Sequence, residues 1–183
     1  MLFRSSIEHI GGFEANLAAK ERLEKLGFTV SFSEHYLEND MLGSASIESR
    51  VADIHAAFAD ESVDAILATI GGFNCNELLP YLDFELIARN PKIFCGYSDT
   101  TALLSAIYSK TGMKTYMGPS YSSFKMDALQ DYQTESWLKA VSQTSYELTP
   151  SEKWGDNAWY LPDAPLTFHE TEWKVYNHGK AGW

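Results

Sequence analysis

The sequence predicts an α/β domain in which a mostly parallel sheet is flanked by helices. Two short and almost continuous apolar runs, at 64–70 and 92–95, are typical of strands that are buried on both faces of such a sheet. Apolar residues recur at helical spacing before the first run and after the second. Because strands alternate with helices along the chain, we expect βαβ units.

The first sixty residues are expected to form a helix, a strand and a second helix. Alanines and leucines at helical spacing predict the first helix over 13–26, and Gly27 ends it. The alternation of apolar and polar residues over 28–32 predicts a strand. A second helix is expected to about residue 60, and it begins at an N-cap within 44–46.

The next elements carry the sequence to residue 150. They comprise two short helical pieces at 76–88 separated at Pro80, a helix over 101–110 ended by Gly112, a strand at 115–117 and a helix over 126–141. The chain after about residue 150 has little periodicity, and we interpret it as a long loop or connection. We therefore divide the chain into an α/β domain at 1–150 and a connecting segment at 151–183.

Charge and composition exclude several classes of function. The net charge of −11 argues against a nucleic-acid partner and disfavours anionic membranes, because both need a basic surface. No apolar run is long enough for a transmembrane helix, and the N-terminus has no apolar signal-peptide core, so we expect a cytoplasmic protein. Cys75 and Cys95 show no metal-binding spacing, so we expect two free thiols, no metal and no cofactor.

Ser98 is the candidate catalytic residue. It lies in the turn between the predicted strand at 92–95 and the helix that follows, so its hydroxyl is expected on a strand-turn-helix elbow, where the backbone N–H of Asp99 is placed to stabilise an oxyanion. Gly71 and Gly72 end the preceding strand, and parallel strands present their carboxyl ends at one edge of the sheet. The residues alone leave other interpretations open, since Ser98 also suits a helix N-cap and Gly71-Gly72 an ordinary turn.

The order of these motifs resembles the LD-carboxypeptidase family of serine peptidases, which includes the microcin C self-immunity proteins. The similarity extends over about 13–183, and the most specific motifs are Gly71-Gly72, Asn90-Pro91-Lys92 and Gly96-Tyr97-Ser98-Asp99. Further similar segments are Arg50–His55, Ala68–Asp83, Thr100–Leu104, Thr111-Gly112 and Gly118-Pro119.

The resemblance implies a Ser-His-Glu triad whose serine matches Ser98. Its oxyanion hole matches the backbone N–H groups of Asp99 and the Gly71-Gly72 turn. The family's histidine and glutamate come from a C-terminal domain, and we expect this chain to stop before that domain, with 151–183 leading toward it. The family's first strand is also expected to be missing here. A homodimer is what the family implies for the intact protein.

The residues around Gly71-Gly72 resemble the microcin immunity branch more than the murein carboxypeptidases. Phe73 and Asn74 follow the glycines, and they are expected to contact the substrate. The segment with Trp154 and Trp159 resembles an aromatic loop of that branch, which implies either stacking on a nucleobase or a hydrophobic plug beneath a loop.

The main hypothesis is a serine carboxypeptidase or amidase that hydrolyses a peptidyl- or aminoacyl-nucleotide amide and thereby gives antibiotic resistance. One alternative is a murein tetrapeptide LD-carboxypeptidase. Another is a truncated chain that keeps the binding crevice without the chemistry, and a third is a nucleotide-binding regulator.

Overall fold

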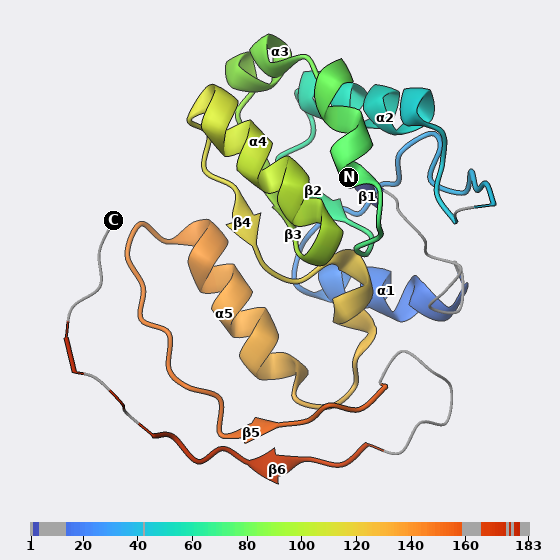
Figure 1. Ribbon diagram of the computed structural model, residues 1–183. Helices are drawn as coiled ribbons and strands as arrows, with labels where there is room; N and C mark the ends of the chain where they lie inside the picture. Colours follow the sequence, from blue (N-terminus) through green and yellow to red (C-terminus); the bar gives the residue numbers. More distant parts are fainter. Residues whose placement is uncertain are drawn as a thin grey trace. The chain divides into compact units, whose positions relative to one another are not determined.

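The chain divides into two compact units, residues 1–146 and 147–183. The computed structural model describes residues 2–3, 14–41, 43–158, 166–174, 176 and 178–179 (Figure 1). The division falls close to the boundary at 150 that the sequence suggests.

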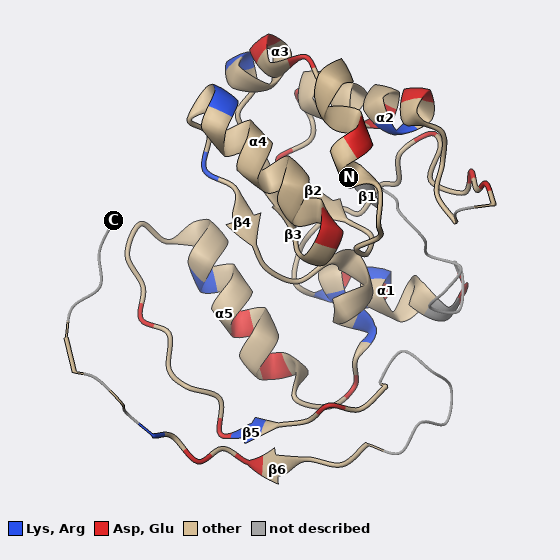
Figure 2. Ribbon diagram, viewed as in Figure 1, with Lys and Arg blue, Asp and Glu red and all other residues tan. Residues whose placement is uncertain are grey.

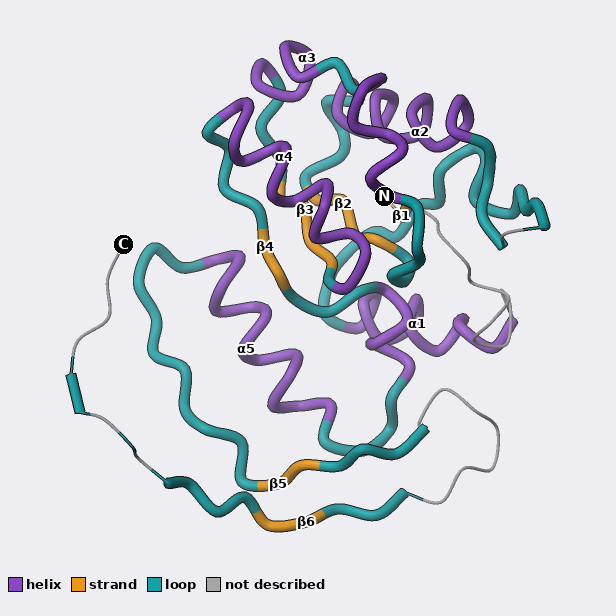
Figure 3. The backbone as a smooth tube through the Cα atoms, viewed as in Figure 1, coloured by secondary structure: helices purple, strands orange, loops and turns teal. Residues whose placement is uncertain are grey.

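Unit 1 contains a parallel sheet whose strand order within the described residues is β1-β2-β3-β4 (Figure 3). The strands are β1 (Leu2–Phe3), β2 (Ala65–Ala68), β3 (Ile93–Gly96) and β4 (Tyr116–Met117). Leu2 and Phe3 pair with Leu67 and Ala68 of β2, and the expected absence of the family's first strand stays a prediction. This pairing requires backbone contacts over only two residues, which leave no recognisable pattern in the sequence.

Helices precede and follow these strands as the sequence predicts. The α-helices are α1 (Leu17–Lys25), α2 (Ile47–Ala59), α3 (Phe84–Arg89), α4 (Thr101–Thr111) and α5 (Gln130–Ser142). The 3-10 helices are η2 (Glu14–Asn16), η3 (Cys75–Tyr81), η4 (Ser98–Thr100) and η5 (Tyr121–Lys125).

Two hydrophobic clusters cover opposite faces of the sheet. Ile66 and Phe94 pack in one cluster with residues of α2, α3 and α4. Leu67 and Cys95 pack in the other cluster with residues of α1, η5 and α5. Because neighbouring residues of a strand point to opposite faces, both faces of β2 and β3 are buried. Neither strand carries a charged residue (Figure 2). Burial of both faces therefore explains why the sequences of β2 and β3 are continuous apolar runs.

Residues 28–32 do not form the predicted strand. Within this segment only Phe32 forms an isolated β-bridge. The two phenylalanine rings instead pack against aromatic rings from other parts of unit 1. The Phe28 ring lies 5.5 Å from the Trp137 ring, and the Phe32 ring lies 4.4 Å from the Tyr36 ring. The alternation therefore reflects side chains that enter the second cluster, without a strand ladder.

The other differences concern helix boundaries and long-range pairing. The last helix begins at Gln130 rather than at 126, because Leu129 before it has a left-handed backbone with a φ of 57°, and η5 ends at Lys125. In η5, the N–H of Ser122 donates to the carbonyl of Thr69 at 3.0 Å, which joins this segment to the chain after β2. Both cysteines are buried, and no disulfide joins them.

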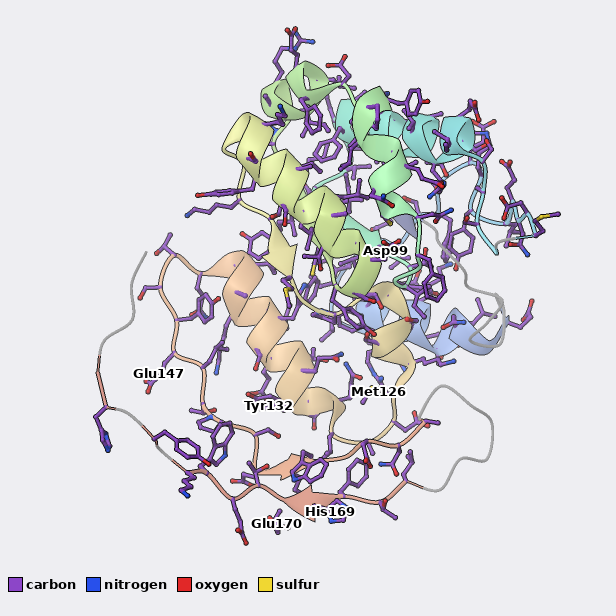
Figure 4. The ribbon with its side chains drawn as sticks, viewed as in Figure 1. Asp99, Met126, Tyr132, Glu147, His169 and Glu170 are labelled. Atoms are coloured by element: carbon purple, nitrogen blue, oxygen red, sulfur yellow. The ribbon has the colours of Figure 1, made fainter. Side chains whose placement is uncertain are left out.

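Unit 2 contains a short antiparallel pair within its described residues. β5 (Lys153–Trp154) pairs with β6 (His169–Glu170), and the sequence analysis missed both strands. Lys153 and Glu170 form an ion pair at 3.5 Å, and the Trp154 ring lies 5.0 Å from the His169 ring (Figure 4). These contacts join segments far apart in the sequence, so the local pattern of neither segment indicates a strand.

Replacing Phe94 by alanine is expected to destabilise unit 1 by about 3–5 kcal/mol, because the change leaves a cavity beneath α2. Phe94 is fully buried in β3, and its ring lies 6.0 Å from the ring of Phe58. The change is measured by urea unfolding of the protein. Tyr108→Ala, at a 61% exposed position on α4, is the control and should cost less than about 0.5 kcal/mol. A cost below about 1 kcal/mol for Phe94→Ala would contradict this view of the core.

Candidate active site

Ser98 lies on the strand-turn-helix elbow that the sequence predicts. β3 ends at Gly96, Tyr97 is extended, and Ser98 begins η4, which leads directly into α4. Ser98 has a φ of 58°, in the left-handed region that L-residues seldom adopt outside glycine, and its side chain is exposed. Such backbone strain is concentrated at functional sites, and it presents this hydroxyl at the carboxyl edge of the sheet.

Gly71 lies directly against this serine. A Cβ atom added to Gly71 would stand 2.7 Å from the Ser98 Cβ, 2.9 Å from its Oγ and 3.5 Å from the backbone nitrogen of Asp99. Only a residue without a side chain fits this approach. The structure thus brings together the two predicted features, the turn after β2 and the elbow after β3, as expected for neighbouring parallel strands.

The side chain of Asp99 joins the same two segments. The Oδ2 atom of Asp99 accepts a hydrogen bond from the N–H of Cys75 at 2.9 Å. Figure 4 labels Asp99, which lies in η4 just before α4. Asp99 therefore fixes the segment 71–75 to the elbow through its carboxylate, while its backbone nitrogen stays on the side of Gly71.

The two residues after the glycines differ in their surroundings. Phe73 is 90% exposed, so its ring is available for a ligand. Asn74 uses its amide inside the protein: its Oδ1 accepts from Arg50 at 3.1 Å, and its Nδ2 donates to the Ser44 Oγ at 3.0 Å. The predicted substrate contacts of Phe73 and Asn74 stay predictions, and the geometry favours the one for Phe73.

Arg50 lies in this region and is not among the predicted site residues. It lies on α2 with 2% of its surface exposed, and it contacts both Asn74 and Glu77. The sequence does contain a sign of this role. Arg50 is spaced so that it lies on the same helix face as Ile54 and Ala57, which are core residues. A charged residue on an apolar helix face indicates a buried polar contact.

The aromatic residues predicted to bind a substrate belong to unit 2. Trp154 is 50% exposed and lies against His169. Asn157 braces the segment, since its Oδ1 accepts from the N–H of Thr167 and its Nδ2 donates to the Thr167 carbonyl. Trp159 lies outside the described residues. The predicted role of both tryptophans stays a prediction.

The histidines described in unit 1 have other partners. The Nδ1 of His35 lies 2.8 Å from the Oδ1 of the buried Asp53, and the Nε2 of His55 accepts from the N–H of Asp83 at 2.9 Å. No hydrogen bond found among the described residues joins a histidine to Ser98. Within the described residues, unit 1 therefore places Ser98 beside Gly71 and the backbone nitrogen of Asp99, with no histidine bonded to the serine.

His35 provides a pH-dependent contact that stabilises the fold. Its hydrogen bond to the Asp53 carboxylate raises the pKa of His35 above the ordinary value, although desolvation opposes this effect. A raised histidine pKa stabilises the folded state at pH values below the unfolded pKa of about 6.5, and this stabilisation is lost as the pH rises through the folded value. Between about pH 6 and 8, the melting temperature of the wild type should therefore decrease more than that of His35→Gln. The test is a thermal unfolding series over that range, with Asp53→Asn expected to behave like His35→Gln; equal slopes for wild type and variants would contradict it.

Two features are absent from the described part of the chain. No group of three or more His, Cys, Asp or Glu residues there is arranged to hold a metal ion. In the same residues, no helix has the length and apolar character that crossing a membrane requires.

Comparison with known families identifies related proteins. The model of the LD-carboxypeptidase N-terminal domain matches residues 5–118. The putative carboxypeptidase YocD of Bacillus subtilis (strain 168) is 51% identical over 157 residues, which cover 85% of this chain and 48% of that protein. A probable murein peptide carboxypeptidase of the same strain is 34% identical over 128 residues, covering 69% of this chain and 40% of the relative.

Solved structures show the same relationship. A MccF-like protein from Bacillus anthracis (strain Ames) superposes with a TM-score of 0.89 at 46% identity, over 93% of this chain and 53% of that one. The microcin C7 self-immunity protein MccF in complex with aspartyl sulfamoyl adenosine gives a TM-score of 0.84 at 33% identity, over 92% and 53%. The chain thus spans about half the length of the proteins it matches.

Proposed function

Because the chain belongs to the LD-carboxypeptidase family of serine peptidases, we propose that Ser98 is the nucleophile of a serine carboxypeptidase or amidase. The contact between Gly71 and Ser98 carries this proposal. It sets an exposed hydroxyl on a strained elbow against Gly71, with the backbone nitrogen of Asp99 on the same side. A serine that served only as a helix cap would need neither the positive φ at Ser98 nor a glycine in close contact with it.

In the proposed reaction, the Ser98 hydroxyl attacks an amide carbonyl while a histidine accepts its proton. The negative oxygen that forms receives hydrogen bonds from the N–H groups of Asp99 and Gly72. The histidine then donates the proton to the departing nitrogen, and an acyl-enzyme remains. Water releases the acyl group and regenerates Ser98. The histidine and its glutamate are proposed to come from a second domain, as the family resemblance implies.

For the substrate, we propose a peptidyl- or aminoacyl-nucleotide amide. The similarity to MccF-like structures supports this class, since one of these proteins was solved with aspartyl sulfamoyl adenosine. Within unit 1, the exposed Phe73 supplies aromatic surface for such a ligand. The relative named as a murein peptide carboxypeptidase supports the alternative, a murein tetrapeptide.

The proposal is tested with the natural protein that carries this chain. A fluorophosphonate probe followed by peptide mapping is expected to label Ser98, and hydrolysis of aspartyl sulfamoyl adenosine should exceed that of a murein tetrapeptide. If the protein prefers the tetrapeptide, the proposed substrate is wrong, whereas the proposed role of Ser98 as nucleophile is retained. Absence of both labelling and hydrolysis would overturn the proposal.

The non-catalytic alternative has its own test. The 183-residue chain by itself is treated with the same probe and with a nucleotide ligand in a calorimeter. Binding of the nucleotide without labelling of Ser98 favours a chain that retains only the binding crevice. Labelling of Ser98 in this chain contradicts that alternative.

A further inference from the structure

Arg50 is a buried cation that the proposed reaction does not use. Only 2% of Arg50 is exposed, whereas charged residues are almost never fully buried without a partner. Removing a guanidinium from water costs several kcal/mol, and well-packed apolar residues often replace a buried ion pair without loss of stability. The fold itself is therefore a weak reason for an arginine at this position.

The contacts of Arg50 converge on one short segment. Its Nη1 donates to the carbonyl of Asn74 at 3.2 Å and to the Asn74 Oδ1 at 3.1 Å, and its Nη2 contacts the Glu77 Oε2 at 3.2 Å. Its Nε donates to the carbonyl of Ser46 at 3.4 Å, at the start of the same helix. One guanidinium thus joins α2 to the backbone and the side chain of Asn74.

Asn74 is the centre of this contact. Its Oδ1 accepts from Arg50 and its Nδ2 donates to Ser44, so both polar atoms of the amide are held within the protein. Its carbonyl also accepts from the N–H of Glu77 at 3.3 Å, which begins η3. The peptide and the amide of Asn74 are both fixed.

The segment 71–75 is therefore held at three points. Gly71 rests on Ser98, Asn74 is held by Arg50, and the N–H of Cys75 is held by the Asp99 carboxylate. Gly72 lies between the first two points, and the proposed mechanism uses its N–H as an oxyanion donor. Oxyanion donors act through preorganisation, so a fixed position of this peptide group matters for the transition state.

We propose that Arg50 is a positioning residue, which acts through Asn74 to hold the oxyanion-binding segment 71–75 against the Ser98 elbow. This inference rests on the proposed function. Arg50 itself does not contact the substrate, and the amide of Asn74 serves as its anchor rather than as a substrate contact. The planar fork of arginine suits this role, because it donates to several acceptors at once in a fixed geometry.

The first test is Arg50→Lys in the natural protein, with aspartyl sulfamoyl adenosine as the substrate. A single ammonium group on a flexible stem cannot reproduce the fork, so the segment should lose its fixed position. We expect kcat to fall by about 10- to 100-fold with KM changed by less than about threefold, since the effect is confined to the transition state. An aldehyde analogue of the acyl group, which forms an oxyanion on Ser98, should lose affinity in parallel with kcat.

Substitutions at the anchor give an independent test if Arg50→Lys does not fold. Asn74→Leu removes both acceptor and donor, and it should reproduce the fall in kcat. Asn74→Asp keeps the acceptors for Arg50 and loses only the donation to Ser44, so its fall in kcat should be smaller than that of Asn74→Leu.

Arg22→Lys is the matched control, because Arg22 also binds two backbone carbonyls, those of Phe124 and Met126, and neither residue belongs to the segment 71–75. It is expected to change stability without changing kcat. Urea unfolding of every variant establishes the folded fraction, so that kcat refers to folded protein.

The outcomes separate this inference from the proposed function. If Ser98→Ala abolishes hydrolysis while Arg50→Lys and Asn74→Leu keep the wild-type kcat, the positioning role is wrong and the nucleophile stands. A rise in KM at constant kcat in either variant would also overturn the positioning role, because it indicates substrate binding. Hydrolysis that survives Ser98→Ala would overturn the proposed function itself.

Discussion

Ser98→Ala is expected to lower kcat of the natural protein by about 10⁶-fold, the loss typical of a removed serine nucleophile. The variant retains the glycine turn and the backbone N–H of Asp99, so the activity that remains reflects binding and oxyanion stabilisation. Labelling by a fluorophosphonate probe should disappear. The measurements are hydrolysis of aspartyl sulfamoyl adenosine and mass spectrometry of the labelled peptide.

Ser105→Ala, at an exposed position on α4, is the control and should leave hydrolysis unchanged. Comparing Ser98→Ala with Ser98→Gly then isolates the strain of the elbow. Because Ser98 has a φ of 58°, glycine should make the protein more stable than alanine does, by about 1 kcal/mol. Hydrolysis at the wild-type rate in Ser98→Ala would show that another group attacks the substrate.

Those parts of the fold that depend on local patterns could be predicted from the sequence. The apolar runs of β2 and β3 follow from burial on both faces, and α2 begins where the Ser46 Oγ accepts from the N–H of Ser49. Gly112, with a φ of 71°, ends α4 as a C-terminal glycine does. In each case the signal lies within a few residues of the structure it determines.

Elements that depend on distant partners could not be predicted. β1 exists through pairing with β2, and β5 through pairing with β6, while their own sequences are two residues long. Residues 28–32 show the reverse case, since their alternation resembles a strand although their aromatic rings pack against Tyr36 and Trp137. Local alternation reports which side chains are buried, and it does not report whether the backbone finds a partner strand.

The candidate site divides in the same way. A topological rule predicts that Gly71 and Ser98 approach each other, because both follow neighbouring parallel strands. The contacts that hold the segment between them, from Arg50 to Asn74 and from Asp99 to Cys75, each join residues 24 positions apart. Nothing local in the sequence specifies such pairs, so the anchor of the site emerges only from the structure.

Gly71→Ala is expected to reduce kcat by at least about 10²-fold. The added methyl group would displace Ser98, and a displacement of about 1 Å near reacting groups costs about this much in rate. The added methyl group would stand 2.7 Å from the Ser98 Cβ and 2.9 Å from its Oγ, closer than non-bonded carbon and oxygen atoms approach. Gly71 does not have a positive φ, so alanine suits its backbone and the effect arises from the contact alone. Hydrolysis and fluorophosphonate labelling measure the loss, and Gly179→Ala, where nothing lies within 4 Å of the added Cβ, is the control.

A double-variant cycle shows whether the contact with Ser98 is the cause. Ser98→Gly removes the Cβ and the Oγ that the new methyl group would meet, and it leaves the rest of the turn in place. In that background Gly71→Ala should cost little stability, whereas in the wild-type background it should destabilise the protein by about 1–3 kcal/mol, the usual cost of overpacking. Urea unfolding of the four proteins gives the coupling energy. Equal costs in the two backgrounds would mean that Gly71 is required for a reason other than its approach to Ser98, and the structural basis of the proposed nucleophile would be lost.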